Sequence, residues 1–582
     1  MNINTSRSRA AAAAITGLAL LGGGAAITSS PANAADPVED CAVPVEVATE
    51  VAPADPVTGL TVDTGTVPEG FTGEILGVIN DGIAPGLPMV MARLSSAEID
   101  RVGIWQGMSG SPVYAENGDL IGAVAYGLAW GPSPVAGITP FEEMDNFLST
   151  DVPTTVKIGD RMAARIAAKT DVTARQARQG FEQLPMPMGF SGVSQRRLDQ
   201  MQGADGPEFI KSRGAMAMGA ASSAAAAAPE DLVAGGNLGA AISYGDISAG
   251  GVGTVTSVCE GRLVGFGHPM GYFGKTTLGM MPAEAVYVQE DPVGPGFKVA
   301  NMGLPAGTID QDRLSGISGP FGEDVVPAQT DVSSYVTYDG RERTGTSHSL
   351  VGDFNADVTF SQLLANHDRV IDAWQEGSEA ATFSIEGTDA NGDPFDIDWS
   401  EQYVSSFDIS YESSWELAET VFLLGQMEDV TVDNIDATAD VSDDTSVWRL
   451  KNVQQKRGGA WVTLGRRQPA VVKPGGTLRL RATLVGGGHT EQLPLTLAVP
   501  RKASRSGFLE VTGGLSSWEN DIYDADTPAE LEEAVAAMTA NDQVNASLRF
   551  FKRGPDIIRE HTSESQDLAV RGRTWAEVLV RR

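Results

Sequence analysis

Cysteine and histidine are scarce in this sequence, and long apolar runs and positive charge are also in short supply. The chain has 582 residues but only 2 Cys and 5 His. Two cysteines are too few for a disulfide-built scaffold or a four-thiolate metal site. No two histidines stand at a His-x-x-x-His spacing, so the sequence predicts no metal centre and no cofactor.

The shortage of positive charge narrows the choice of partners. Lys and Arg number 41 against 76 Asp and Glu, which gives a formal net charge of −35 and a pI near 4.4. Recognition of nucleic acid needs clustered Lys and Arg, and so does electrostatic attachment to anionic membranes. We therefore expect neither partner. Hydrophobic residues make up 42% of the chain, which is enough for packed cores.

The N-terminus has the pattern of an export signal. Arg7 and Arg9 precede an apolar stretch over 10–27, and Ala32-Asn33-Ala34 follows as a small-x-small cleavage site. We expect cleavage after Ala34 and a secreted or cell-envelope location. No later stretch approaches the roughly 18–20 apolar residues of a membrane span, so we expect no integral membrane segment after the signal is removed.

The two cysteines, Cys41 and Cys259, are expected to form one disulfide in an exported chain. The alternative is a pair of unpaired thiols in apolar surroundings, and the sequence alone does not decide between them.

Changes of pattern along the chain predict a mostly β protein with a helical insertion. Short apolar runs punctuated by Gly, Pro and Asn-Asp dominate before residue 155 and after residue 231, whereas 161–179 has helical spacing. The predicted segments are a signal peptide (1–34), a β segment (35–154), a helical insertion with an Ala-rich linker (155–230), a second β segment (231–350), an acidic mixed region (351–446), a β-sandwich-like module (447–526) and a C-terminal helix and tail (527–582).

The segment richest in chemistry is a Gly-x-Ser-Gly-x-Pro corner at 107–112, followed by two apolar runs around Asn117-Gly118. Asn-Gly accepts positive φ at both central turn positions, so it predicts a β-hairpin. Glycines let the backbone fold tightly and present amide N–H groups to one point, as an oxyanion hole requires. The N–H groups of Gly107 and Ser109 are the expected donors. The alternative is a Gly/Ser-rich turn before an ordinary hairpin.

This segment, GIWQGMSGSPVYAENGDLIGAVAYG (103–127), resembles the nucleophile region of the sporulation stage IV B (SpoIVB) serine peptidase family. A second block, 251–256 followed by Val264-Gly265-Phe266-Gly267-His268-Pro269-Met270, resembles that family's strand and its histidine turn. A third, Gly307 to Gly319, is similar to a block of exported bacterial relatives. The resemblance covers about 57–150 and 235–330, and it implies a chymotrypsin-like double β-barrel.

The resemblance also implies residue roles. Ser109 would be the nucleophile and His268 the general base, because a serine hydroxyl needs a positioned imidazole to take its proton. Substrate would bind as an extended strand beside 123–128, with Ala125, Tyr126 and Gly127 in contact. Ser111 is the rival serine and is interpreted as a neighbour. The alternative for His268 is a turn histidine whose ring is satisfied locally.

Two departures from the family stand out. Here the serine half precedes the histidine half, so the two barrels are expected in exchanged order, which triad geometry tolerates. The family's acid before the serine motif is missing: the stretch 91–96 has no carboxylate, and Asp100 is misplaced. Asp246 and Asp312 are the remaining candidates for the third triad member.

Two weaker patterns have simple interpretations. Residues 389–393 place oxygen-bearing side chains at alternate positions, like the opening of a calcium-binding loop. Pro394 and Ser400 break that pattern, which favours a hairpin turn. The basic helical stretch 161–178 is interpreted as a solvated helix face.

Two functions remain open from the sequence. The first is an exported serine endopeptidase that acts on protein or peptide substrates, with self-processing as one outcome. The second is a non-proteolytic secreted or cell-envelope scaffold that binds proteins on the same fold. The sequence indicates neither an oligomeric state nor a cleavage specificity.

Overall fold

A computed structural model describes residues 41–128, 131–144, 155–156, 159–170, 172–178, 180–183, 189–201, 216–217, 221, 227–516, 521–551 and 556–581. The expected signal peptide, 1–34, lies outside them, as does most of the Ala-rich linker. Strands make up 49% of the structure and helices 19%, which confirms a mostly β fold. Residues Asp40–Arg582 form one unit, and the description below concerns this unit.

The first β-barrel contains the serine motif. It closes through the strand order β4-β1-β2-β3-β6-β5, with β5 returning to β4, and every pair is antiparallel. Its interior is filled by buried apolar side chains such as Phe71, Val90 and Trp105. Its strands are β1 (Pro56–Thr61), β2 (Glu69–Ala84), β3 (Leu87–Ser95), β4 (Pro112–Tyr114), β5 (Leu120–Leu128) and β6 (Val135–Pro140), with the short helices α1 (Val47–Glu50), α2 (Ala97–Val102) and α3 (Phe141–Met144).

The hairpin predicted at Asn117-Gly118 joins β4 to β5. Gly118 has a φ of +92°, and the Asn117 side chain accepts the amide N–H of Asp119. Positive φ is nearly free of strain for glycine, so the chain turns here without a steric penalty.

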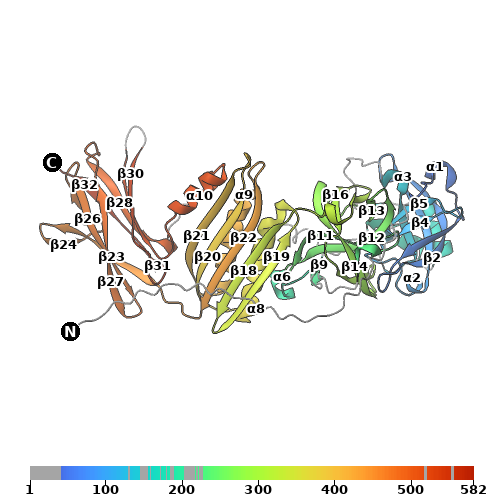
Figure 1. Cartoon of the computed structure of the whole chain (residues 1–582), viewed down its shortest axis with the longest axis horizontal. Coiled ribbons are helices and arrows are strands. Elements are labelled where there is room, and N and C mark those ends of the chain that lie inside the picture. Colours follow the sequence, from blue (N-terminus) through green and yellow to red (C-terminus); the bar gives the residue numbers. More distant parts are fainter. Residues whose placement is uncertain are drawn as a thin grey trace, which may run out of the picture. The chain divides into compact units, whose positions relative to one another are not determined.

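A second β-barrel of the same design contains the histidine motif. Its order is β12-β13-β17-β16-β14-β11, and β11 closes onto β12. The double barrel expected from the sequence is therefore present (Figure 1). Its strands are β11 (Asn237–Gly245), β12 (Ala249–Cys259), β13 (Arg262–Gly265), β14 (Gly274–Gln289), β16 (Gly307–Arg313) and β17 (Gly316–Pro320); β15 (Phe297–Met302) pairs with β14 outside the closed ring.

The two barrels share one topology. Counted along the chain, each has its strands in the order 1-2-3-6-5-4 around the ring. The segment with Ser109 joins the third and fourth strands of the first barrel, and the segment with His268 joins the third and fourth strands of the second. The two motifs thus occupy equivalent connections.

The insertion between the barrels is built of short elements, and the predicted helix at 161–179 forms two of them, α4 and α5. Ala163 and Ile166 of α4 are buried against the first barrel. Farther along, the buried guanidinium of Arg197 on α6 pairs with Asp368 at 2.6 Å and Asp408 at 2.5 Å. The elements are β7 (Thr155–Val156), α4 (Asp160–Lys169), α5 (Ala174–Ala177), β8 (Phe181–Gln183), β9 (Gly189–Phe190), α6 (Gln195–Met201) and β10 (Met216–Ala217).

The acidic region, expected at 351–446, belongs to an α/β layer (residues 330–442) whose first strands precede residue 351. Strand β19 pairs with β11 of the second barrel, and the sheet continues in the order β19-β18-β22-β20-β21. Helices α8 and α9 pack against each other and against the sheet strands (Figure 1). Its elements are β18 (Thr330–Tyr338), β19 (Arg341–Ser349), α8 (Asn355–Ile371), β20 (Gly377–Thr388), β21 (Pro394–Ser405), α9 (Ile409–Gly425) and β22 (Thr431–Ser442). The stretch 389–393 is the hairpin turn between β20 and β21.

The C-terminal β-sandwich (residues 448–580) extends beyond residue 526, where the sequence suggested an end. Its second sheet needs the late strands, because β28 pairs with both β29 and β32 and their apolar faces fill one core. The strands are β23 (Trp448–Arg457), β24 (Ala460–Thr463), β25 (Ala470–Val472), β26 (Thr477–Gly486), β27 (His489–Ala498), β28 (Ser506–Gly513), β29 (Val544–Phe550), β30 (Ile557–Thr562), β31 (Val570–Arg571) and β32 (Arg573–Val580). Helix α10 (Pro528–Ala537) begins after Thr527, whose side-chain oxygen caps it by accepting the amide N–H of Glu530.

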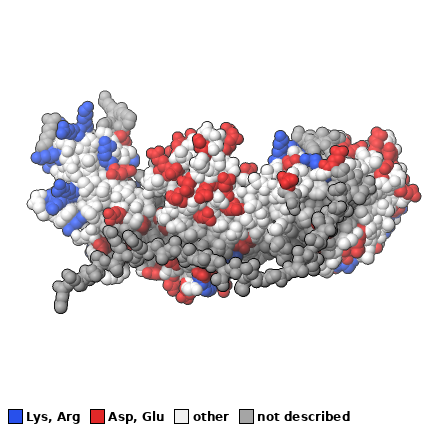
Figure 2. Space-filling view, in the orientation of Figure 1, with Lys and Arg blue, Asp and Glu red and all other residues white. Residues whose placement is uncertain are grey.

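Charge differs between these two parts. On the face shown in Figure 2, Asp and Glu gather over the strands of the α/β layer, whereas Lys and Arg gather over the sandwich. Residues 448–516 contain 12 Lys and Arg but only two Asp and Glu. The acidity of the whole chain therefore does not extend to its C-terminal part.

One buried carboxyl links the α/β layer to the sandwich. Glu401 on β21 is 9% exposed and accepts the amide N–H of Asn541 at 2.7 Å. Burial raises the pKa of Glu401 to about 8, and the nearby Glu416 adds to the effect. The folded chain therefore holds a proton here that the unfolded chain releases near pH 4.5.

We expect this protonation to make stability fall as pH rises. The stabilising contribution is complete below about pH 4.5 and is lost by about pH 8, for a total of the order of 5 kcal/mol. In calorimetry, Glu401→Gln should flatten the decrease in melting temperature between these pH values. The exposed Glu386→Gln on β20 is the control and should retain the decrease. Equal pH slopes for wild type and Glu401→Gln would contradict this assignment.

Candidate functional site

The serine corner (residues 107–111) turns tightly because of its glycines. Gly107 and Gly110 have φ of +95° and +100°. A Cβ on Gly110 would lie 1.9 Å from the carbonyl oxygen of Thr254, so no other residue fits there. The amide of Gly110 donates to Val124 on β5 at 2.7 Å, which fixes the corner to its own barrel.

The carbonyl groups of the corner are held by β12 of the second barrel. The Thr254 amide donates to the carbonyl of Ser109 at 2.8 Å, and the Thr254 hydroxyl donates to that of Gly107 at 3.1 Å. The Thr256 hydroxyl donates to the carbonyl of Gly110 at 2.7 Å. Within the described part of the chain, the amide N–H groups of Gly107 and Ser109 donate no hydrogen bond. These two groups are thus the ones available to an oxyanion.

The histidine turn (residues 266–270) lies against the first barrel in return. Phe266 and Gly267 both have left-handed φ, +68° and +70°, which reverses the chain after β13. The Gly267 carbonyl accepts the hydroxyl of Thr139 on β6 at 2.6 Å. A Cβ on Gly267 would come within 3.0 Å of the Cβ of Ala125 on β5, so the turn packs closely on that strand.

These contacts bring the two predicted residues together. His268 Nε2 lies 2.8 Å from Ser109 Oγ, and the side chains are almost fully buried, at 0% and 1% exposure. His268 Nδ1 lies 2.8 Å from the carbonyl oxygen of Pro269. A carbonyl only accepts, so Nδ1 carries the proton of the neutral ring and Nε2 accepts the serine proton. This is the tautomer that a general base needs.

Asp312 stabilises the backbone that follows His268. It lies near the end of β16 in the second barrel and is fully buried. Its carboxylate accepts hydrogen bonds from the amide N–H groups of Met270, Gly271 and Phe273 at 2.7–3.1 Å. Of the two acids proposed from the sequence, this one lies at the histidine turn. Its hydrogen bonds to the end of the turn and to the backbone directly after it make it a positioning residue.

The other candidates have separate partners. Asp246 pairs with Arg343 at 2.8 Å and accepts the Thr346 amide, so its carboxylate fixes the junction of β11 and β19. The Ser111 hydroxyl donates to Thr61 at 2.9 Å inside the first barrel. Ser109 is thus the serine of the corner that faces the histidine.

The predicted substrate strand is already paired. Ala125, Tyr126 and Gly127 lie on β5, and all three are buried. Strand β8 of the insertion runs antiparallel to β5 over Tyr126–Leu128, and β7 pairs with the far side of β8. An incoming peptide would need this edge, so substrate cannot add here as the chain is folded.

Lys298 is a neighbour of the corner that the sequence did not indicate. Its amide donates to the Gln106 carbonyl at 2.9 Å, and a Cβ on Gly107 would lie 2.8 Å from the Lys298 Cβ. Its ammonium donates to Asn237 Oδ1 at 2.7 Å, and burial lowers the pKa of Lys298 to about 7. A lone lysine on the strand Phe297–Met302 has no sequence signature, because its role depends on the approach of another barrel.

The expected disulfide joins the barrels near the site. Cys41 and Cys259 are bonded, with their Cα atoms 4.8 Å apart. Cys259 ends β12, the strand that holds the serine corner, and Val45 near Cys41 pairs with Leu120 at the start of β5. The bridge thus connects the two strands that position both motifs.

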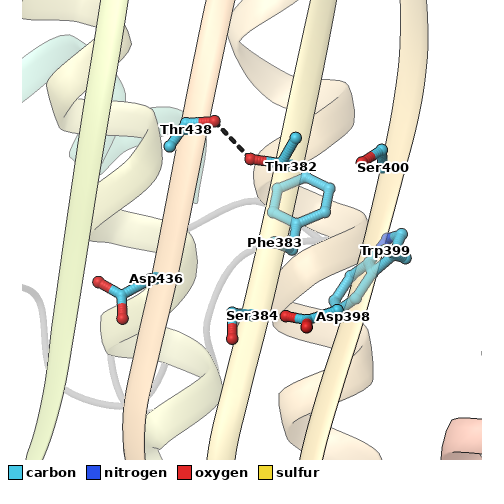
Figure 3. Close-up of a pocket in the computed structure, with 8 residues that line it drawn as sticks. All are labelled: Thr382, Phe383, Ser384, Asp398, Trp399, Ser400, Asp436 and Thr438. Carbon is cyan, nitrogen blue, oxygen red and sulfur yellow. Dashed lines mark hydrogen bonds between the residues drawn. The ribbon is translucent and has the colours of Figure 1, made fainter. Parts of the chain in front are cut away.

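A separate shallow pocket of about 460 Å³ lies on the α/β layer. Thr382, Ser384, Asp398, Ser400, Asp436 and Thr438 surround it with Phe383 and Trp399 (Figure 3). No histidine lines this pocket. Among the described residues, no three His, Cys, Asp or Glu side chains gather as a metal site requires. None of the described helices has the length and apolar composition to cross a bilayer.

Comparison with known proteins adds no assignment: no family model, no curated protein and no solved structure matches this chain. The site is therefore interpreted from its own geometry.

Removing the charge of Asp312 should loosen the histidine turn. In Asp312→Asn, one oxygen is replaced by a donor that faces amide donors, which should cost about 1–3 kcal/mol in denaturant unfolding. Asp310→Asn on the same strand is the matched control, because its partner Arg262 is half exposed and such pairs contribute about 0–1 kcal/mol. Equal losses in the two variants would argue against a special role for Asp312.

Reduction of the disulfide should loosen both barrels. The bridge spans 218 residues, and breaking such a link typically costs about 2–5 kcal/mol. We expect reductant to lower the melting temperature of the wild type. The double variant Cys41→Ala with Cys259→Ala should melt at the same lower temperature, and reductant should not lower it further. Identical melting temperatures of the wild type with and without reductant would contradict a stabilising role for the disulfide.

Proposed function

We propose that the protein is an exported serine endopeptidase of the SpoIVB-like type that hydrolyses peptide bonds in protein or peptide substrates. The observation that supports this most is the hydrogen bond between Ser109 Oγ and His268 Nε2, with the ring in the base-competent tautomer. The exchanged order of the barrels is compatible with it, because triads are defined by geometry rather than by chain order.

The reaction would begin with proton transfer from Ser109 to His268 Nε2 as Oγ attacks the substrate carbonyl carbon. The N–H groups of Gly107 and Ser109 would stabilise the oxyanion of the tetrahedral intermediate. The imidazolium then gives its proton to the leaving amine, which breaks the C–N bond. In deacylation, His268 Nε2 takes a proton from water as the water oxygen attacks the acyl ester. It then gives that proton to Ser109 Oγ as the ester bond breaks, which releases the acid and restores the serine hydroxyl.

The orientation of the ring would rest on the Pro269 carbonyl and, one step removed, on Asp312. The carbonyl holds the Nδ1 proton in place, and Asp312 holds the turn that carries this carbonyl. Self-processing is one outcome of such an activity.

Export through the N-terminal signal would place this activity outside the cytoplasm, in the medium or the cell envelope. The single disulfide supports that location, because disulfides persist in oxidising compartments.

The second candidate is a non-proteolytic protein-binding scaffold on the same fold. The near-complete burial of Ser109 and His268 favours it, since substrate has no open path to either side chain in this conformation. In that case the exposed sheets of the α/β layer and the sandwich would provide the binding surfaces.

A fluorophosphonate probe separates the two functions. We expect labelling of the full-length wild type, none in Ser109→Ala, and a loss of about a thousandfold or more in His268→Ala. Ser111→Ala is the matched control and should still be labelled, because that hydroxyl bonds to Thr61. No labelling of the wild type, either in buffer or in non-denaturing urea that loosens local contacts, would support the scaffold instead.

A further inference from the structure

The edge of β5 that continues past the serine corner is occupied by the chain itself. Strand β4 pairs with β5 only as far as Ala123, so the following part of that edge is not used to close the barrel. Strand β8 pairs there, with Gln183 opposite Tyr126, Glu182 opposite Gly127 and Phe181 opposite Leu128.

This pairing begins close to the reactive serine. Val124 on β5 accepts the amide of Gly110, the residue that follows Ser109. Tyr126 lies only two residues farther along the same strand. An extended segment on this edge therefore lies in the position from which a substrate strand would present its carbonyl to the corner.

We propose that β8 is an intramolecular inhibitory strand that holds the substrate edge of β5 in the folded protein. This inference rests on the proposed peptidase function. It specifies an extended, main-chain-recognised peptide as the ligand of that edge, with β8 as its resident occupant.

The segment is held from both ends, which favours a built-in blocker over a passing contact. Before β8, α4 buries Ala163 and Ile166 against the first barrel, and Arg165 donates to the Leu76 carbonyl at 2.7 Å. After β8, β9 pairs with β12 of the second barrel, and Phe190 is buried in its core.

Farther along, the buried guanidinium of Arg197 secures α6 to the α/β layer through ion pairs with Asp368 and Asp408. The segments on either side of β8 are thus attached to the first barrel, the second barrel and the α/β layer. If β8 separates from β5, these flanking segments stay in place.

Tethering also sets the strength of inhibition. A strand held by short connections competes at an effective concentration of about a millimolar, far above that of a typical peptide substrate in an assay.

The test removes backbone donors from β8 without changing the catalytic pair. Successive N–H groups of a strand point to opposite edges, so Glu182→Pro with Gln183→Pro removes one donor that faces β5. The matched control, Glu182→Ala with Gln183→Ala, keeps both donors. We measure fluorophosphonate labelling of Ser109 and hydrolysis of fluorescein-labelled casein by the full-length chain.

We expect the proline pair to raise both rates at least about tenfold over wild type, while the alanine pair stays near wild type. Hydrogen exchange at β12 verifies that the proline pair retains its barrels, and faster exchange at 126–128 reports release of β8. Equal rates in all three proteins, with that release observed, would overturn the inhibitory strand and leave the peptidase intact. No labelling of any of them would remove the peptidase and the inference together.

Discussion

The site depends on a reciprocal exchange of contacts between two barrels. The serine corner of the first barrel gives its carbonyls to Thr254 and Thr256 on β12 of the second. The histidine turn of the second barrel packs on β5 and accepts a hydrogen bond from Thr139 of the first. Neither motif is shaped by its own barrel alone. If the barrels separated, the corner would lose the bonds that hold its carbonyls, and the imidazole would lose its serine.

Glycine is what allows this close approach. Gly110 and Gly267 stand where any side chain would meet the opposite barrel, and both have positive φ. The threonine hydroxyls then satisfy carbonyls that would otherwise be buried without a donor, at a cost of about 1–3 kcal/mol each. The disulfide closes the same junction covalently. The chemistry of the site is thus a property of the interface between the barrels.

Local parts of this arrangement could be predicted from the sequence. Asn117-Gly118 specifies its own turn, Thr527 caps its own helix, and the alternation of 477–484 predicts a strand. The pairing of Ser109 with His268 came from a family resemblance, because no spacing rule connects residues so far apart. The sequence does not separate Asp312 from Asp246, because the hydrogen bonds that Asp312 accepts from backbone amides near His268 exist only in the folded chain.

The remaining features depend on distant pairing. Three residues of β8 have no detectable period, so their place on β5 follows only from the folded insertion. The sandwich likewise ends well after residue 526, because β28 finds its partners on both sides of α10. The support of the serine corner by Lys298 needs the β14–β15 hairpin to reach the first barrel.

The most direct test of the account is ¹⁵N NMR of the five histidine side chains, with His268 assigned by its loss in His268→Ala. The account predicts a neutral His268 ring with its proton on Nδ1, and an Nε2 resonance that shifts in Ser109→Ala because the serine hydrogen bond is gone. A ring protonated on Nε2 alone, or one indifferent to Ser109→Ala, would contradict the pairing from which the function is inferred.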